Sequence, residues 1–221
     1  FENLEIMKKI IFLAMLAVSC ISLTSCVNND DGYYEPEIVN VGQINYDGVS
    51  FPLRNAVVAD IKKADGGFYY SVELSTNPVP KNGKLNGAYL YLEIFQRGDL
   101  NFNGTYVTEN NDRGLDYIEY YEDPIMQNYV PVLNSGTFAL LDTDFSSGSI
   151  NLKNYFDPYN RSLLSTNFAL RVSNGKTLTG DFDGLFDFIQ LYNKSAKGAV
   201  IAKSATTERE KTGVRRPSAR K

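Results

Sequence analysis

Short apolar runs separated by turn residues fill the chain from about Ile38 to Tyr192, and no stretch offers a long apolar stripe with helical spacing. This pattern is typical of an all-β domain. It predicts an antiparallel β-sandwich, with a partly open β-barrel as the alternative. The predicted strands are residues 56–61, 68–74, 88–95, 104–108, 117–121, 137–141, 149–152, 167–172 and 178–192.

Glycine-containing turns divide these strands. Ala64-Asp65-Gly66-Gly67 lies between two apolar runs and predicts a β-hairpin, because glycine supplies the positive φ of a tight turn. Asn174-Gly175 predicts a second hairpin, between residues 167–172 and 178–192. Asn82-Gly83 and Asn103-Gly104 are turn signals of the same kind.

The last predicted strand carries two glycines on its apolar side. Gly180 and Gly184 share the parity of Leu178, Phe182, Phe186 and Phe188. Glycine inside a strand marks a bulge or a close backbone approach. We therefore expect a bend, as in a strand that passes between two sheets or turns a barrel corner.

The first 25 residues have the layout of a secretory signal. Lys8 and Lys9 follow Met7, the expected start, Ile10 to Val18 are apolar, and small residues precede Cys26. The apolar run is too short to span a bilayer, which needs about 20 residues. Residues 1–25 are thus predicted to be an upstream extension plus a signal peptide.

Leu23-Thr24-Ser25-Cys26 resembles the lipobox of bacterial lipoproteins. The resemblance implies that the Cys26 thiol carries diacylglycerol, that the leader is cut before it, and that the new amino group is acylated, typically with palmitate. Several acyl chains give durable membrane attachment. The alternative is an ordinary signal peptide with a cysteine after its cleavage site.

Residues 26–37 are polar and acidic, and their composition predicts a flexible tether. Asn28-Asn29-Asp30-Asp31 resembles the export signal of surface lipoproteins in Bacteroidetes-type bacteria. The resemblance implies an outer-membrane protein displayed at the cell surface, with the periplasmic face as the alternative.

Three further motifs look like recurring elements of small β-sandwich lipoproteins of unknown function from Bacteroidetes-type bacteria. They are Gly104-Thr105-Tyr106, Ser147-Gly148-Ser149-Ile150-Asn151 and residues 175–184. The resemblance covers most of residues 33–192. Such proteins have no agreed activity, so it implies a fold and a location only.

Composition excludes several chemistries. The chain has no histidine, which excludes Ser-His-Asp and Cys-His catalysis and the usual catalytic zinc sites. Its two cysteines, Cys20 and Cys26, lie in the leader and at the lipid position, so the domain has no thiol for a disulfide. From Cys26 to Ala196 there are twelve basic and twenty-two acidic residues, which argues against a nucleic-acid partner.

Composition also sets the domain boundaries. We expect one β-domain over residues 38–194. Residues 195–221 are basic and without aromatic residues, and their composition predicts disorder. Two interpretations of this tail stay open, a basic arm for anionic lipid or glycan and a reading-frame artefact.

The densest acidic cluster is interleaved with tyrosines. Asp116, Glu119, Tyr117, Tyr120 and Tyr121 are the candidate ligand contacts, for a glycan or an envelope protein. Asp112, Glu122 and Asp123 extend the cluster, and glycoside hydrolysis needs only two carboxylates. The plainer interpretation is an acidic sheet edge that discourages pairing with neighbours.

Two short acidic motifs have oxygen ligands that would suit calcium, namely Asp142-Thr143-Asp144 and Asp181-Phe182-Asp183-Gly184. In the second motif the acids alternate with phenylalanines, so solvent-facing strand positions explain them without an ion. No metal and no cofactor are predicted.

These observations together predict a membrane-anchored lipoprotein of the cell envelope. Its β-domain would act as a binding or structural module rather than as an enzyme. A carbohydrate-active enzyme that uses two carboxylates and a fimbrial or adhesin subunit are the alternatives.

Overall fold

The computed structural model describes residues 36–64, 66–133 and 135–190, without the side chains of residues 62–64. The predicted signal peptide, Cys26, the tether up to residue 35 and the basic tail lie outside the described residues. The described strands all belong to a compact unit that begins at Glu37.

The described residues form fifteen strands and one short 3-10 helix, and no α-helix. The strands are β1 (Val41–Tyr46), β2 (Val49–Pro52), β3 (Asn55–Ala64), β4 (Gly67–Ser75), β5 (Asn82–Lys84), β6 (Ala88–Arg97), β7 (Gly104–Val107), β8 (Arg113–Glu122), β9 (Ile125–Gln127), β10 (Val130–Pro131), β11 (Phe138–Leu140), β12 (Phe145–Phe156), β13 (Ser162–Val172), β14 (Thr177–Leu185) and β15 (Asp187–Gln190), and the helix is η1 (Asp142–Asp144).

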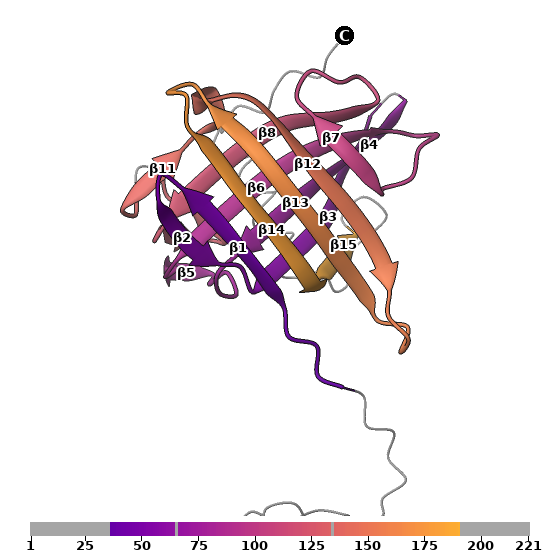
Figure 1. Ribbon diagram of the computed structural model, residues 1–221, viewed down its shortest axis with the longest axis horizontal. Helices are drawn as coiled ribbons and strands as arrows, with labels where there is room; N and C mark the ends of the chain where they lie inside the picture. Colours follow the sequence, from indigo (N-terminus) through magenta and orange to yellow (C-terminus); the bar gives the residue numbers. More distant parts are fainter. Residues whose placement is uncertain (1–35, 65, 134, 191–221) are drawn as a thin grey trace, which may run out of the picture. The chain divides into compact units, whose positions relative to one another are not determined.

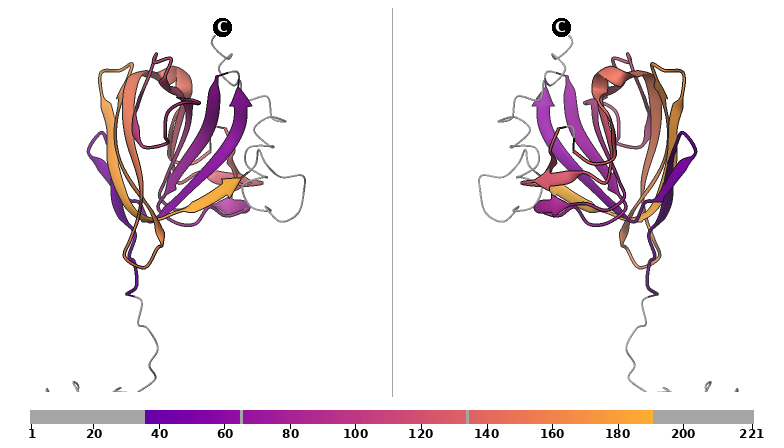
Figure 2. Two further views of the ribbon diagram at one scale, coloured as in Figure 1. Left: turned by 90° about the vertical axis from the view of Figure 1, so that its right-hand side faces the viewer. Right: turned by 90° about the vertical axis from the view of Figure 1, so that its left-hand side faces the viewer.

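Twelve of these strands form one curled sheet in the order β15-β3-β4-β6-β8-β7-β12-β13-β14-β1-β2, with β11 also paired to β8. Strands β12, β13, β14, β1 and β2 form a front wall, and β15, β3, β4, β6 and β8 form a rear wall that crosses behind it (Figure 1). Figure 2 shows the two walls from the side, facing each other across the interior. A second, small sheet has the order β10-β9-β5.

The main core lies between the two walls. Leu90 and Leu92 of β6 and Phe168 and Leu170 of β13 are among its buried residues, each two positions apart along its strand. Side chains two apart point to the same face of a sheet, so apolar residues at alternate positions can meet across the interior. The all-β prediction is confirmed. The two walls pack face to face, as in a β-sandwich. They are also joined through β7 into one continuous sheet, as in a partly open β-barrel.

Both predicted hairpins are confirmed. β3 pairs antiparallel with β4, and β13 pairs antiparallel with β14. The prediction of a turn at Asn82-Gly83 is wrong, because both residues lie in β5 and pair with Gln127 and Met126 of β9. The predicted strands do not include the β1–β2 hairpin. Its turn signal is Asp47-Gly48, where the φ angles are 50° and 82°.

The predicted bend in the last strand is present. β14 ends at Leu185 after pairing with β13 and β1 in the front wall, and β15 begins two residues later and pairs parallel with β3 in the rear wall. Phe182 is buried, but Phe188 is 48% exposed. The common face expected for the phenylalanines therefore ends with β14, because the strand changes walls.

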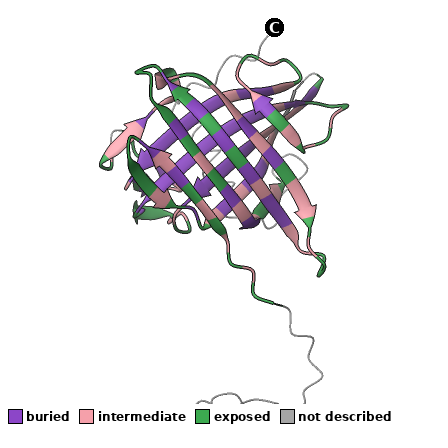
Figure 3. Cartoon of the chain, in the orientation of Figure 1, coloured by how far each residue is buried: buried purple, intermediate pink, exposed green. Residues whose placement is uncertain are grey.

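The walls differ in how many of their faces are covered. Along β13 and β14 buried and exposed residues alternate, whereas β6 is buried at almost every position and β8 at most (Figure 3). The front wall therefore has one solvent-facing side. At β4, β6 and β8 the rear wall is covered on both sides, and the second covered face there holds three of the five predicted site residues, Tyr117, Glu119 and Tyr121.

Candidate functional site

Tyrosines and glutamates line the face of β4, β6 and β8 that points away from the main core. Tyr91 of β6 lies opposite Glu73 of β4 and opposite Glu119 of β8. Glu93 lies opposite Tyr117 in the neighbouring row. We call this set the tyrosine–glutamate face and define it as Glu73, Tyr89, Tyr91, Glu93, Tyr117, Glu119 and Tyr121.

Three tyrosine hydroxyls of this face donate hydrogen bonds to its glutamates. Tyr91 donates to Oε1 of Glu93 at 2.7 Å. The Tyr89 hydroxyl lies 3.0 Å from Oε2 of Glu73 on the adjacent strand. Tyr117 donates to Oε1 of Glu119. Each carboxylate therefore accepts from a buried hydroxyl, which offsets part of the free-energy cost of removing it from water.

The rings of these tyrosines pack across the strands. Tyr91 and Tyr117 have ring centroids 6.1 Å apart at an interplanar angle of 75°, an edge-to-face arrangement. Tyr89 and Tyr121 are 6.4 Å apart and tilted. Edge-to-face and tilted geometries suit the ring quadrupole, so the four tyrosines form a cohesive layer.

Apolar side chains from the loops and short strands complete this layer. Leu85, Met126 and the four tyrosines form a second buried cluster, separate from the main core. The partly buried Val79, Ala139 and Leu141 pack against it. Glu119 is only 4% exposed, and Glu73 and Glu93 are also buried. The tyrosine–glutamate face is therefore part of the interior of the folded unit.

The five candidate contact residues do not lie together. Tyr117, Glu119 and Tyr121 belong to the tyrosine–glutamate face, whereas Tyr120 points the other way into the main core. Successive side chains of a strand alternate between its faces, so a run of neighbouring residues cannot form one surface. Asp116 lies at an irregularity where Glu93 and Ile94 of β6 pair with Tyr117 and Leu115 of β8.

Tyr120 makes its own pair with a glutamate. Its hydroxyl donates to Oε1 of Glu122 at 3.0 Å, and both residues are buried. Burial, together with the nearby Glu122 carboxylate, raises the pKa of Tyr120 far above its ordinary value. Tyr120 is therefore a core residue that stays protonated.

Asp142 approaches the same strand from η1. Its Oδ1 accepts the backbone N–H of Ile118 at 3.0 Å. Burial raises the pKa of Asp142, the Ile118 hydrogen bond opposes the rise, and the charges of Glu119 and Asp116 add to it. This carboxyl therefore takes up a proton more readily than an ordinary aspartate.

The remaining acids of the predicted cluster have separate structural partners. Asp112 forms an exposed ion pair with Arg97 at 2.8 Å. Asp123 accepts the backbone N–H of Gly87 at 2.6 Å and pairs with Lys84 at 3.2 Å. The hydrogen bond from Gly87, and then the charge of Lys84, hold the pKa of Asp123 below its usual value.

The two calcium candidates serve local structure. Asp144 accepts the backbone N–H of Leu141 at 2.8 Å in the turn of η1. Asp183 accepts the hydroxyl of Tyr155 at 2.8 Å, and Asp181 is exposed. Among residues 36–190, apart from the two that are not described, no group of three or more acidic side chains is arranged to hold a metal ion.

Sequence reasoning missed Glu73, Glu93, Tyr89 and Tyr91. A signal for part of this set is present in the sequence, because Tyr-x-Glu occurs at Tyr91, Tyr117 and Tyr120. Residues i and i+2 share a face of a strand, so this spacing places a hydroxyl beside a carboxylate. No local signal brings Glu73 to the same face, since that depends on the pairing of β4 with β6.

Comparisons with protein-family models, with curated proteins and with solved structures give no match for this chain. The part of the chain that the structure describes contains no helix of the length and hydropathy needed to cross a bilayer.

Proposed function

We propose that this chain is a lipid-anchored lipoprotein of the cell envelope, attached through Cys26, with its β-domain as a binding or structural module. The observation that carries the proposal is Leu23-Thr24-Ser25-Cys26 at the end of a leader with a positive start and an apolar centre. The folded unit beginning at Glu37, eleven residues after Cys26, is compatible with it. The proposed location is the outer membrane of a Bacteroidetes-type cell, facing outward.

The leader offers a matched control for lipidation, because it contains a second cysteine. The full chain is expressed in a bacterium fed labelled palmitate, and the mature protein is examined by mass spectrometry. We expect a chain that begins at Cys26 and carries three acyl groups. Cys20→Ala should leave this mass unchanged, and Cys26→Ala should abolish the label and release the protein from the membrane fraction. An unmodified, soluble wild-type chain would refute the proposal.

A binding role is supported by the concentration of tyrosine and glutamate on the second face of the rear wall. Tyrosine combines an apolar ring with a polar tip, and carboxylates accept hydroxyl donors, so such a face suits a glycan or a polar segment of an envelope protein. Because the face is buried, access requires movement of strand β9, which carries Met126, and of the segment after β5 that carries Leu85.

A glycan array probed with the purified protein tests this role. We expect binding that is weakened by Tyr117→Phe and Glu119→Gln and unaffected by Asp112→Asn, an exposed acid outside the face. Binding that all three substitutions weaken equally, or no binding at all, would refute the binding role and leave the structural role as the proposed function.

A carboxylate-dependent carbohydrate-active enzyme is the second candidate, favoured by one observation. Glu73 and Glu119 lie on either side of Tyr91, two strands apart. Neighbouring strands are about 4.8 Å apart, so the two backbones are separated by about 10 Å, from which side chains on one face can bring their carboxyl groups to the roughly 6.5–9.5 Å of an inverting pair. Release of reducing sugar that Glu119→Gln or Glu73→Gln abolishes would favour this activity over binding alone.

A further inference from the structure

Exposed apolar side chains gather at the end of the front wall where the chain enters the folded unit. Val39 is 67% exposed, Phe156 64% and Val41 52%. Leu185 and Tyr159 are the other two members, at 38% and 39%. We call these five residues the tether-end surface.

Strand pairing brings to one end of the front wall the strand ends that carry Phe156, Leu185 and Val41. In the order β12-β13-β14-β1, Phe156 pairs with Ser162, Leu163 pairs with Leu185, and Val41 pairs with Asp183. The antiparallel directions place the last residues of β12 and β14 beside the first residues of β13 and β1.

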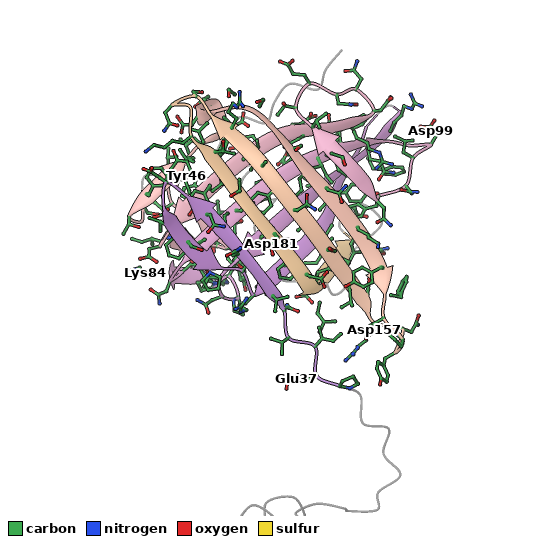
Figure 4. All side chains as sticks on the ribbon, viewed as in Figure 1. Glu37, Tyr46, Lys84, Asp99, Asp157 and Asp181 are labelled. Carbon is green, nitrogen blue, oxygen red and sulfur yellow. The ribbon has the colours of Figure 1, made fainter. Side chains whose placement is uncertain are left out.

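The side chain of Asn40 fixes the start of the chain to this end. Its Oδ1 accepts the N–H of Leu185 at 2.7 Å, and its amide nitrogen donates to the Leu185 carbonyl at 3.1 Å. Figure 4 shows Glu37 and Asp157 at the same end of the wall. Val39 and the β12–β13 turn therefore lie at the same end of the front wall.

The rest of the outer side of the front wall is polar. Asn167, Arg171, Thr179 and Asp181 are exposed on β13 and β14. Toward the tether end the same side carries a row of Tyr155, Leu163 and Leu185. The apolar character is thus confined to one end of the wall and is not a general property of its outer side.

Three charged groups at this end, Arg161, Asp157 and Asp183, already have partners. Arg161 lies 2.7 Å from Asp157 and also over the ring of Tyr159, 5.2 Å from its centroid. Asp183 accepts the hydroxyl of Tyr155. Paired charges cost less to bring into a region of low dielectric than isolated ones, and an aromatic ring beside a cation suits the boundary between water and lipid.

We propose that the tether-end surface rests on the lipid bilayer, with Phe156 and Tyr159 among the head groups. This inference rests on the proposed lipid anchor at Cys26. Eleven residues from Cys26 to Glu37 reach at most about 40 Å, so the anchor keeps this end close to the bilayer at a high effective concentration. The β13–β14 turn at Asn174-Gly175 then points away from the membrane, as the far end of β14.

The bilayer is favoured over a second copy of the chain by the position of the surface. The surface includes Val39 and Val41, close to the point where the anchored segment joins the fold, so the anchored state holds it near lipid continuously. The charges of Arg161 and Lys153 offset those of Asp157 and Asp183, and Glu37 leaves this end with a net charge of only about −1. Apolar contact rather than attraction to anionic lipid therefore drives the docking, and it should depend little on salt.

A single-thiol labelling experiment tests the orientation. The sequence has no cysteine between Cys26 and its last residue, so Phe156→Cys and Thr177→Cys each give one site for an environment-sensitive dye. The lipidated full chain is reconstituted in phosphatidylcholine vesicles. We expect a blue-shifted label at position 156 that brominated lipid quenches, and a label at position 177 that only aqueous iodide quenches.

Flotation separates failure of the docking from failure of the anchor. A protein that does not float with the vesicles lacks the anchor, which would refute the proposed function as well. A protein that floats but gives the same emission at positions 156 and 177 would overturn the docking alone. A shift at position 156 that appears without vesicles and grows with protein concentration would identify a second copy as the occupant and also overturn it.

A variant without the apolar side chains completes the test. Phe156→Ser combined with Leu185→Ser, with the dye placed at Val39→Cys, should float like the wild type and lose quenching by brominated lipid. Both substituted side chains are exposed, so folding is expected to be unaffected, and circular dichroism checks this. Retained quenching would mean that the tether alone determines the position of this end.

Discussion

The Tyr91 hydroxyl donates to Oε1 of Glu93 at 2.7 Å, two residues along the same strand, and both side chains are buried. The pair shows how β6 keeps a carboxylate inside the fold. The side chains between and beside them, Leu90, Leu92 and Ile94, face the main core. One strand therefore contributes to two interiors, an apolar one and one built from hydroxyls and carboxylates.

Loss of this hydroxyl should destabilise the protein. Tyr91→Phe removes a donor to a buried carboxylate, and we expect the free energy of unfolding to fall by about 1–3 kcal/mol. Urea denaturation of Tyr91→Phe, Glu93→Gln and the double variant gives the coupling energy. A double variant whose loss equals the sum of the single losses would contradict a direct interaction.

Gly180 is a position where a methyl group does not fit. A Cβ there would lie 2.5 Å from the carbonyl oxygen of Gln43 and against the ring of Phe168. Gly180→Ala should therefore lower the free energy of unfolding by about 1–3 kcal/mol, because β1 and β14 must move apart. Gly98→Ala is the matched control, since its nearest neighbour would be 3.4 Å away. Equal melting temperatures for the two variants would refute the steric explanation.

Asp123 should stabilise the fold at neutral pH and less so in acid. Its pKa is lowered in the folded state, so its contribution is present above the ordinary carboxyl pKa and is lost as pH falls through the folded value. Asp123→Asn keeps a residue that tolerates the φ of 52°. We expect a loss of about 0.5–1 kcal/mol at pH 7 that shrinks toward pH 3, measured by urea denaturation across that range.

Asp142 should respond in the opposite direction. Its pKa is raised, so the folded state favours the protonated form, and the associated stability is lost as pH rises through the folded value. Asp142→Asn can still accept the Ile118 N–H through its amide oxygen. The variant should equal or exceed the wild type in stability at pH 7, and this advantage should disappear in acid. A loss of stability at pH 7 like that of Asp123→Asn would contradict the raised pKa of Asp142.

Tyr106 should make the stability of the fold depend on pH in the alkaline range. Burial raises its pKa to about 12, and its hydroxyl donates to the Phe102 carbonyl at 2.7 Å. An unfolded tyrosine ionises near pH 10, so this contribution is complete below pH 10 and is lost as pH rises through about 12. Tyr106→Phe should cost about 1 kcal/mol at pH 7 and progressively less above pH 10. Urea denaturation that gives the same cost for Tyr106→Phe at pH 7 and at pH 12 would contradict this account.

Among the candidate site residues, the sequence located the right strand but not the right grouping. The prediction of a strand over residues 117–121 is confirmed, and Tyr117, Glu119 and Tyr121 share a face because every second residue does. Tyr120 was assigned to the same site although its parity places it in the main core. A cluster of residues chosen by composition alone mixes the two faces of a strand. Taking every second residue along the strand separates the faces.

The sequence by itself determined the all-β class, the two glycine-turn hairpins and the bend after Gly184, because alternation and turn geometry act over a few residues. Only the tertiary structure decided that β4, β6 and β8 are covered on both faces, that Glu73 joins Glu93 and Glu119, and that the end of β12 lies at the end of the wall where the chain enters the fold. These relationships depend on which strands pair and in which register. Strand pairing is set by burial summed over the whole sheet, and no short segment contains that information.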